Sequence, residues 1–228
     1  MLKELFGKIP YTADLYDAFR RSRPRTRYNL EQLKAALPAA VEQVRPYAEK
    51  APAGKKLLLF ATLHYWVEQA AMVGLALRGL GHDVTVAYLP YGDWRKDINN
   101  FDLHRQDLYT RRVLAPLDGL VTTASLLASR PASSDLSSDL IADIHLVSTY
   151  DAQYTLQVEE VDENNDLYRL RFRRNEYAAR AALAYLQAKR PDVVLIPNGT
   201  ITELGAVYRM ARYLGIRAVT YEFNDQRE

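Results

Sequence analysis

Near the amino terminus, apolar residues recur every three or four positions with charged residues between them. They are Leu30, Leu33, Leu37, Val41 and Val44. This spacing is typical of an amphipathic helix, so we expect residues 1–50 to be helical. Pro46, Pro52 and Gly54 then interrupt the pattern. Because proline and glycine mark breaks in regular structure, we assign residues 1–54 to an N-terminal helical segment and residues 55–228 to the domain on which it packs.

Beyond this boundary the pattern alternates between short apolar runs and longer mixed segments. The first group is an expected strand at 57–61, a helix at 67–80 that stops at Gly81, and a strand at 84–89. The second group is a strand at 192–196, a helix at 201–214 and a strand at 217–221. Each group has the order and size of a βαβ unit. Thr200 and Glu203 match a capping box at the start of the last helix.

Buried strands joined by helices predict a parallel sheet with helices on both faces. With right-handed crossovers, residues 55–228 are expected to form a Rossmann-like, doubly wound α/β domain. The middle of the chain is harder to interpret. We expect a polar helix at 100–118, a weak strand at 120–127, a linker at 129–135, a strand or the start of a helix at 167–173, and a helix at 176–189.

Composition narrows the classes of protein. Lys and Arg total 30 and Asp and Glu total 28, so the net charge of +2 gives no overall basic field for nucleic acid,. There is no Cys, which excludes disulfides, thiolate metal sites and cysteine nucleophiles,. No apolar run approaches the roughly 20 residues of a membrane helix, and no signal peptide is recognisable. We therefore expect a soluble, cytoplasmic protein.

Candidate chemistry gathers where the predicted strands end, because open α/β sheets bind ligands at the carboxyl ends of their strands. Four loops meet this condition, at 62–66, 90–95, 197–200 and 222–225. We expect their tips to gather around a shared cleft. The chain has no glycine-rich dinucleotide motif, no phosphate-binding P-loop motif and no G-x-S-x-G elbow. Its four His residues lack metal-ligand spacing, so no metal site is predicted,.

His64 is the leading candidate for a general base, because imidazole titrates near neutral pH. Local hydrogen bonding or helix capping is the alternative role. Tyr65, Trp66 and Tyr91 stand in the same loops, where aromatic rings suit a sugar or a nucleobase, although plain packing also explains them. Asp93 and Glu222 are rival carboxylates, each equally compatible with an ordinary surface position.

The Asn198-Gly199 pair has two interpretations. Glycine permits a sharp turn and asparagine tolerates unusual backbone angles, which explains the pair structurally. The functional interpretation is that glycine lets a ligand approach the backbone. A basic group, Arg20, Arg21, Arg23, Arg25 and Arg27, either contacts anionic lipid headgroups or forms a solvated face,.

Two stretches resemble a known family. The run LLLFATLHYWVEQAAMVGLALRGLGHDVTVAYLP is similar to the opening βαβ unit of glycosyltransferases with the GT-B fold, in particular at Gly81-His82-Asp83-Val84-Thr85-Val86. The run RPDVVLIPNGTITELGAVYRMARYLGIRAVTYE resembles a later part of the same domain in bacterial surface-polysaccharide glycosyltransferases. Related sugar-nucleotide epimerases and other Rossmann-like domains share the first motif.

The resemblance implies the N-terminal, acceptor-side domain of a two-domain enzyme, with the C-terminal domain absent from this chain. It implies no resident cofactor, since a nucleotide-sugar donor would be a cosubstrate bound mainly by the missing domain. The acceptor would be a carbohydrate or a lipid-linked sugar. His64, Asp93 and Glu222 are the candidate catalytic residues under this hypothesis. The candidate acceptor-binding residues are Tyr65, Trp66, Tyr91, Asn198, Gly199 and Glu203.

The expected reaction is sugar transfer in surface-polysaccharide or glycolipid synthesis, in the cytoplasm and peripheral to the inner membrane face. The isolated domain is expected to be inactive. Two alternatives stay open. One is a non-catalytic α/β ligand-binding module, and the other is half of a sugar-nucleotide epimerase.

Overall fold

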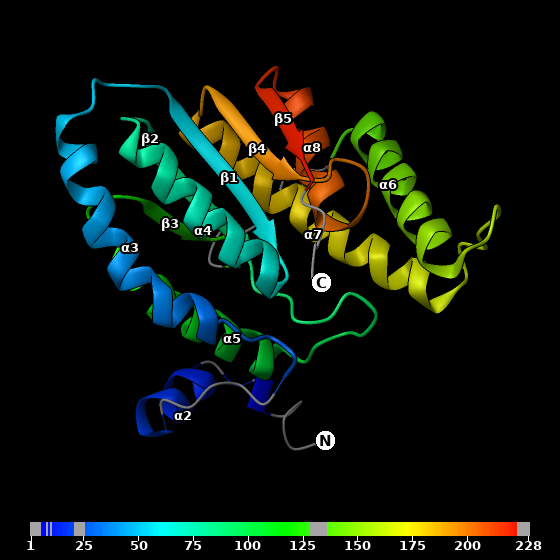
Figure 1. The fold of residues 1–228 in the computed structure, drawn as a ribbon. Helices are drawn as coiled ribbons and strands as arrows, with labels where there is room; N and C mark the ends of the chain where they lie inside the picture. Colours follow the sequence, from blue (N-terminus) through cyan, green and yellow to red (C-terminus); the bar gives the residue numbers. More distant parts are fainter. Residues whose placement is uncertain (1–5, 8, 10, 21–25, 128–135, 223–228) are drawn as a thin grey trace. The chain divides into compact units, whose positions relative to one another are not determined.

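The computed structural model of the 228-residue chain describes all residues except 1–5, 8, 10, 21–25, 128–135 and 223–228 (Figure 1). The described helices are α2 (Thr12–Arg20), α3 (Glu31–Lys50), α4 (His64–Gly79), α5 (Asn100–Leu114), η1 (Ala115–Leu117), α6 (Ser138–Leu156), α7 (Asp166–Lys189) and α8 (Thr202–Tyr213). The strands are β1 (Lys56–Thr62), β2 (Asp83–Leu89), β3 (Thr122–Ser125), β4 (Val193–Pro197) and β5 (Arg217–Tyr221).

Internal contacts divide the chain into two compact units. The first comprises Met1–Gly54 and Thr62–Ser125, and the second comprises Lys55–Ala61 and Leu126–Glu228. In the first unit, β2 and β3 pair in parallel, with Thr85 opposite Thr122 and Tyr88 opposite Ser125. Helix α4 packs on β2, α3 packs on α4, and α2 packs on α5.

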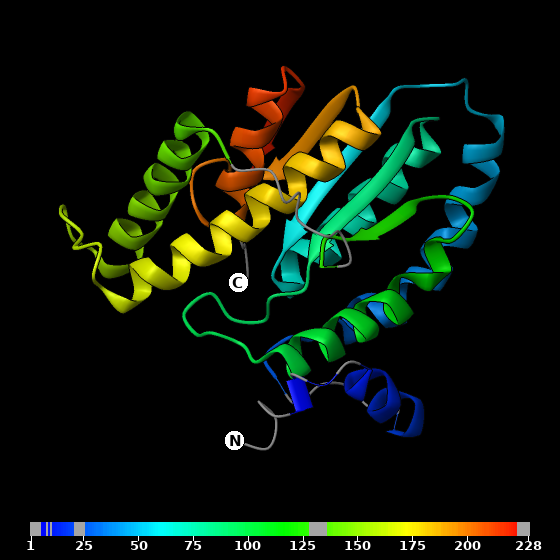
Figure 2. The same cartoon turned by 180° about the vertical axis from the view of Figure 1, so that it is seen from behind.

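In the second unit, β1 pairs with β4 and β4 pairs with β5, all in parallel. Helices α6 and α7 lie side by side as a helical hairpin, and α8 packs against both (Figures 1 and 2). Strand β1 is buried along nearly its whole length, whereas β5 is partly exposed. Its exposed positions account for the mixed sequence Arg-Ala-Val-Thr-Tyr.

Five parallel strands with flanking helices confirm the predicted Rossmann-like α/β class. The apolar runs at 57–61 and 84–89 became β1 and β2, because a strand covered on both faces needs an unbroken apolar sequence,. The segment at 167–173, left open as strand or helix, is the start of α7. Helix α6 was not predicted at all.

The proline signals near the amino terminus were misleading in one respect. Helix α3 continues through Pro38 and Pro46 to Lys50, although both prolines lie inside it. Its buried stripe is Leu33, Leu37, Val41 and Ala48. The free energy gained by burying this stripe exceeds the free energy lost with the backbone hydrogen bonds that the two prolines remove.

Candidate functional site

The carboxyl ends of β4 and β5 are level with each other. The parallel register places Pro197 opposite Tyr221, so the next residues along each strand, Asn198 and Glu222, leave the strands side by side. The Asn198 Nδ2 donates a hydrogen bond to Glu222 Oε1 at 2.9 Å. Strand register alone therefore joins two residues that are far apart in sequence.

Asn198 also shapes the turn that leads into α8. Its backbone is left-handed, with φ at 51°, a conformation that asparagine tolerates better than most residues,. Its Oδ1 accepts hydrogen bonds from the amides of Thr200, at 2.7 Å, and Ile201, at 3.3 Å. Both ends of the side-chain amide are therefore engaged, which fixes its orientation.

The predicted capping box at Thr200 and Glu203 is wrong. Helix α8 begins at Thr202, and its N-cap residue Ile201 makes no side-chain capping hydrogen bond. The Asn198 side chain instead accepts from the amides of Thr200 and Ile201, and Thr202 Oγ1 accepts from the Leu204 amide at 3.4 Å. Glu203 turns inward instead and is 1% exposed.

Gly199 sits where the turn passes close to β5. A Cβ atom at this position would lie 2.6 Å from Thr220 Cγ2 and 3.3 Å from the Tyr208 ring. No side chain fits there without displacing these neighbours. This close packing explains why glycine occupies position 199, whether or not a ligand approaches the backbone there.

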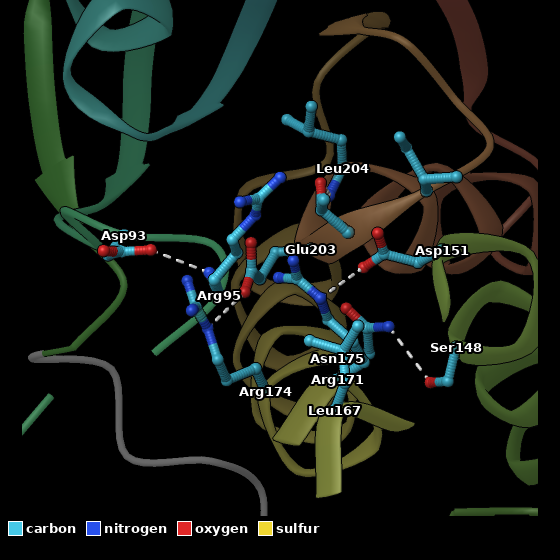
Figure 3. Close-up of polar contacts among 12 residues, drawn as sticks. Asp93, Arg95, Ser148, Asp151, Leu167, Arg171, Arg174, Asn175, Glu203 and Leu204 are labelled. Carbon is cyan, nitrogen blue, oxygen red and sulfur yellow. Dashed lines mark hydrogen bonds and ion pairs between the residues drawn. The ribbon is translucent and has the colours of Figure 1, made fainter. Parts of the chain in front are cut away.

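Two buried ion pairs lie behind this turn (Figure 3). Arg174 Nε is 2.6 Å from Glu203 Oε1, and Arg171 Nε is 2.9 Å from Asp151 Oδ2. Asn175 Nδ2 donates to Ser148 Oγ at 3.1 Å beside them. The pairs link α7 to the start of α8 and to α6, so they hold the helix that follows the Asn198 turn.

Asp151 adds a contact from α6 to the start of α8. Its carboxylate accepts a hydrogen bond from the amide of Thr202. Thr202 has φ at 56°, a rare conformation for a β-branched residue, so this contact stabilises a strained position,. Burial raises the pKa of Asp151 to about 6, while the Arg171 guanidinium acts in the opposite direction.

Sequence reasoning did not single out these buried charges. Arg171, Arg174 and Asn175 follow helical spacing on α7, as Ser148 and Asp151 do on α6. Recognising both segments as helices would have shown that each set occupies one face. The signal was present in 167–173, where apolar residues and arginines alternate.

In the first unit, His64 is the first residue of α4. The prediction that His64, Tyr65 and Trp66 lie in a loop is therefore wrong, because the helix starts three residues earlier than 67. The turn is made at Leu63, which has φ at 61° and ψ at 149° and is only 5% exposed. This backbone region is essentially restricted to glycine, so a buried leucine there is strained.

The aromatic residues predicted around His64 differ in exposure. The His64 ring centroid lies 5.3 Å from that of Tyr65 and 6.3 Å from that of Tyr28. The ring centroids of Tyr65 and Trp66 are 5.6 Å apart, and the Tyr65 side chain is exposed. Tyr91, in contrast, is buried.

Asp93 organises the loop after β2. Its Oδ1 accepts a hydrogen bond from the Arg95 amide at 2.8 Å (Figure 3). Its Oδ2 lies 3.8 Å from Arg27 Nη1. The Arg95 guanidinium stacks 4.3 Å from the Trp94 ring centroid. The negative charge of Asp93 is therefore partly neutralised by Arg27.

The predicted site residues thus fall into two sets. His64, Tyr65, Trp66, Tyr91 and Asp93 belong to the first unit, and Asn198, Gly199, Glu203 and Glu222 belong to the second. Within the second set, Asn198 and Glu222 are in direct contact. Of the basic group, Arg27 is exposed, whereas Arg21, Arg23 and Arg25 and the side chain of Arg20 lie outside the described residues.

The described part of the chain contains no group of three or more His, Asp or Glu side chains suited to a metal ion. None of its helices is long and apolar enough to cross a membrane. No model of a known protein family matches the chain, and no curated protein matches it.

Proposed function

We propose that this chain is the acceptor-binding α/β domain of a GT-B type glycosyltransferase, acting in surface-polysaccharide or glycolipid synthesis. The observation that carries the proposal is the pair of Asn198 and Glu222 at the carboxyl ends of adjacent parallel strands. Parallel α/β sheets bind their ligands at this edge. The sequence resemblance described above supplies the reaction class.

The geometry of the pair suits a sugar hydroxyl. Glu222 is exposed and Asn198 holds one of its carboxylate oxygens, while its Oε2 has no protein partner among the described residues. A carboxylate fixed at one oxygen and open at the other can accept a hydrogen bond from an acceptor hydroxyl in a defined direction. Charge-assisted bonds of this kind orient the acceptor for attack on the donor.

His64, in the first unit, is the candidate general base of the proposed transfer. Its placement supports the role, since a strained residue directly after a buried strand sets it on the first turn of α4. Strain at such a junction is typical of functional positions. Tyr65, exposed beside it, offers a ring face to a sugar,.

Glu203 has a positioning role here. Its carboxylate is paired with Arg174 and buried, so it fixes α8 and the Asn198 turn. The nucleotide-sugar donor is a cosubstrate in this scheme, and its phosphates are held by a partner domain. Peripheral contact with anionic lipid through the basic group at 20–27 belongs to the same proposal.

The test is acceptor-dependent release of nucleoside diphosphate by the natural full-length protein, with a panel of UDP-, GDP- and dTDP-sugars. His64→Ala is expected to lower kcat by about 100- to 10,000-fold, as the loss of a general base does. Glu222→Gln keeps an acceptor for Asn198 but removes the charge, and is expected to raise the acceptor KM by about tenfold. His104→Ala, at an exposed position on α5, is the matched control and should leave both constants unchanged.

Equal activity of the His64→Ala and His104→Ala variants would remove His64 from the mechanism. Donor cleavage without any acceptor would favour the epimerase alternative. Saccharide binding without any transfer would favour a non-catalytic module. Each of these results contradicts the proposal.

A further inference from the structure

A surface cavity of about 540 Å³ lies in the first unit, between the loop after β2 and the start of α5. It is lined by Thr26, Arg27, Gly92, Asp93, Lys96, Asp97, Ile98, Asn99, Asp102 and Gln106. Its volume falls in the range of about 300–1,000 Å³ that is usual for small-molecule sites. It also opens at the carboxyl end of a parallel strand, where α/β domains bind ligands.

Gly92 determines how closely the loop approaches the helix. A Cβ atom on Gly92 would lie 2.6 Å from Gln106 Nε2 and 3.0 Å from Tyr28 Cβ. Any other residue would push the loop away from α5 or displace Gln106. The wall of the cavity therefore depends on glycine at this position.

Gln106 forms the buried floor of the cavity, with 0% of its surface exposed. Its Nε2 donates a hydrogen bond to the Pro90 carbonyl at 3.2 Å, which settles the orientation of the amide group. Its Oε1 is buried and has no hydrogen-bond partner among the described residues. A buried acceptor without a donor destabilises a protein, so a ligand hydroxyl that donates to this atom would be favourable.

The charges around the cavity balance. Asp93 faces Arg27, and Asp102 accepts from Asn99 Nδ2 at 2.9 Å and lies 4.0 Å from Arg105. Lys96 and Asp97 add one charge of each sign. A lining of balanced charges and amide groups matches a neutral ligand whose hydroxyls both donate and accept hydrogen bonds.

We propose that this cavity binds a monosaccharide-sized, polyhydroxyl ligand, one hydroxyl of which donates to Gln106 Oε1. The inference goes beyond the proposed transfer reaction, because it assigns a binding site formed wholly by the first unit and requires no catalysis. Asp93 and Asn99 supply further polar atoms at the rim.

The experiment is a two-dimensional ¹H–¹⁵N NMR titration of the whole chain with the methyl glycosides of glucose, galactose, mannose and N-acetylglucosamine. Concentrations up to about 50 mM cover the millimolar dissociation constants expected for single sugars. At least one probe is expected to shift the amide signals of Gly92, Asn99 and Gln106. Gln106→Met, which keeps the volume but removes the acceptor, is expected to weaken binding at least tenfold.

Two more variants make the result decisive. Asp97→Trp introduces a bulky ring at an exposed lining position, so it should abolish the shifts without disturbing the core. Asp118→Asn changes a second cavity of about 550 Å³, lined in part by Arg78, Asp83 and Gly119, and should leave binding unchanged.

No shift at these amides with any probe would overturn the inference, as would full binding by both Gln106→Met and Asp97→Trp. If the full-length protein transfers sugar but no saccharide binds in this cavity, only this inference is contradicted. If a saccharide binds in this cavity but no sugar is transferred, only the proposed function is contradicted.

Discussion

Asp151 connects α6 to both α7 and α8 in the second unit. It is buried, pairs with Arg171 and accepts the amide hydrogen of Thr202. The free energy lost when the carboxylate leaves water exceeds the free energy gained from its attraction to one guanidinium. Burial therefore raises the pKa of Asp151 to about 6, although Arg171 lies 2.9 Å away. Its neighbours Glu203 and Arg174 act in opposite directions, Glu203 raising the pKa and Arg174 lowering it.

We predict that stability falls as pH rises from about 4 to about 6. An aspartate in the unfolded chain titrates near 3.9, so in this interval the folded protein binds the extra proton. The shift of about two pKa units corresponds to about 3 kcal/mol of unfolding free energy. A ¹³C NMR titration of the Asp151 carboxyl should show a midpoint near 6.

The unfolding free energy of Asp151→Asn, measured in urea at several pH values, is the control. It should lack the decline between pH 4 and pH 6 that the parent protein shows. A carboxyl midpoint below 4, or an unchanged decline in the variant, would contradict the account of Asp151.

At the scale of elements, the start of α8 is assembled from three other segments. Asn198 accepts hydrogen bonds from the amides of Thr200 and Ile201. Asp151 on α6 accepts a hydrogen bond from the amide of Thr202, and Arg174 on α7 forms an ion pair with Glu203. These tertiary contacts add to the local hydrogen bond from the Leu204 amide to Thr202 Oγ1. Such a junction keeps the Asn198 turn in place beside Glu222.

We predict that Arg174→Met destabilises the fold by about 3–5 kcal/mol, because it leaves the Glu203 carboxylate buried without its partner. The double variant Arg174→Met, Glu203→Leu should recover most of this loss, since it removes both charges. Urea unfolding measures each variant. Arg209→Met is the matched control, because its pair with Asp143 is partly exposed, and it should cost less than about 1 kcal/mol,.

A double variant no more stable than Arg174→Met alone would show that Glu203 does not depend on this arginine. Equal losses from Arg174→Met and Arg209→Met would show that burial of the pair adds nothing.

The sequence predicted the strands that consist of short apolar runs. The apolar runs of β1, β2 and β4 were recognised, and so was the expected backbone of Asn198. The start of α4 was misplaced because no sequence signal marks a leucine at positive φ. The buried arginines of α7 were missed because a charged side chain is normally exposed, and only three-dimensional pairing reveals the exception.

The candidate site shows the same division. Asn198 and Glu222 were both predicted, because each directly follows a strand, but their contact depends on a register that the sequence does not contain. The cavity at Gly92 and Gln106 was not predicted, since it arises from packing between a loop and a helix. Glu203 was predicted to bind an acceptor, and its pairing with Arg174 became visible only once α7 was in place.

At the scale of the whole molecule, both units place their candidate chemistry at the carboxyl ends of parallel strands. His64 follows β1, the Gly92 loop follows β2, and Asn198 and Glu222 follow β4 and β5. Loops and helix starts meet at these ends, so polar groups can face a ligand there without interrupting the strands. We predict that saccharide binding is confined to these ends.

The most direct test of the central claim is a crystal structure of the natural full-length protein with an acceptor saccharide that supports transfer. The account predicts a sugar hydroxyl within hydrogen-bond distance of Glu222 Oε2, with Asn198 Nδ2 still bonded to Oε1. A saccharide bound instead beside Asp83 and Gly119, at the amino ends of β2 and β3, would contradict it.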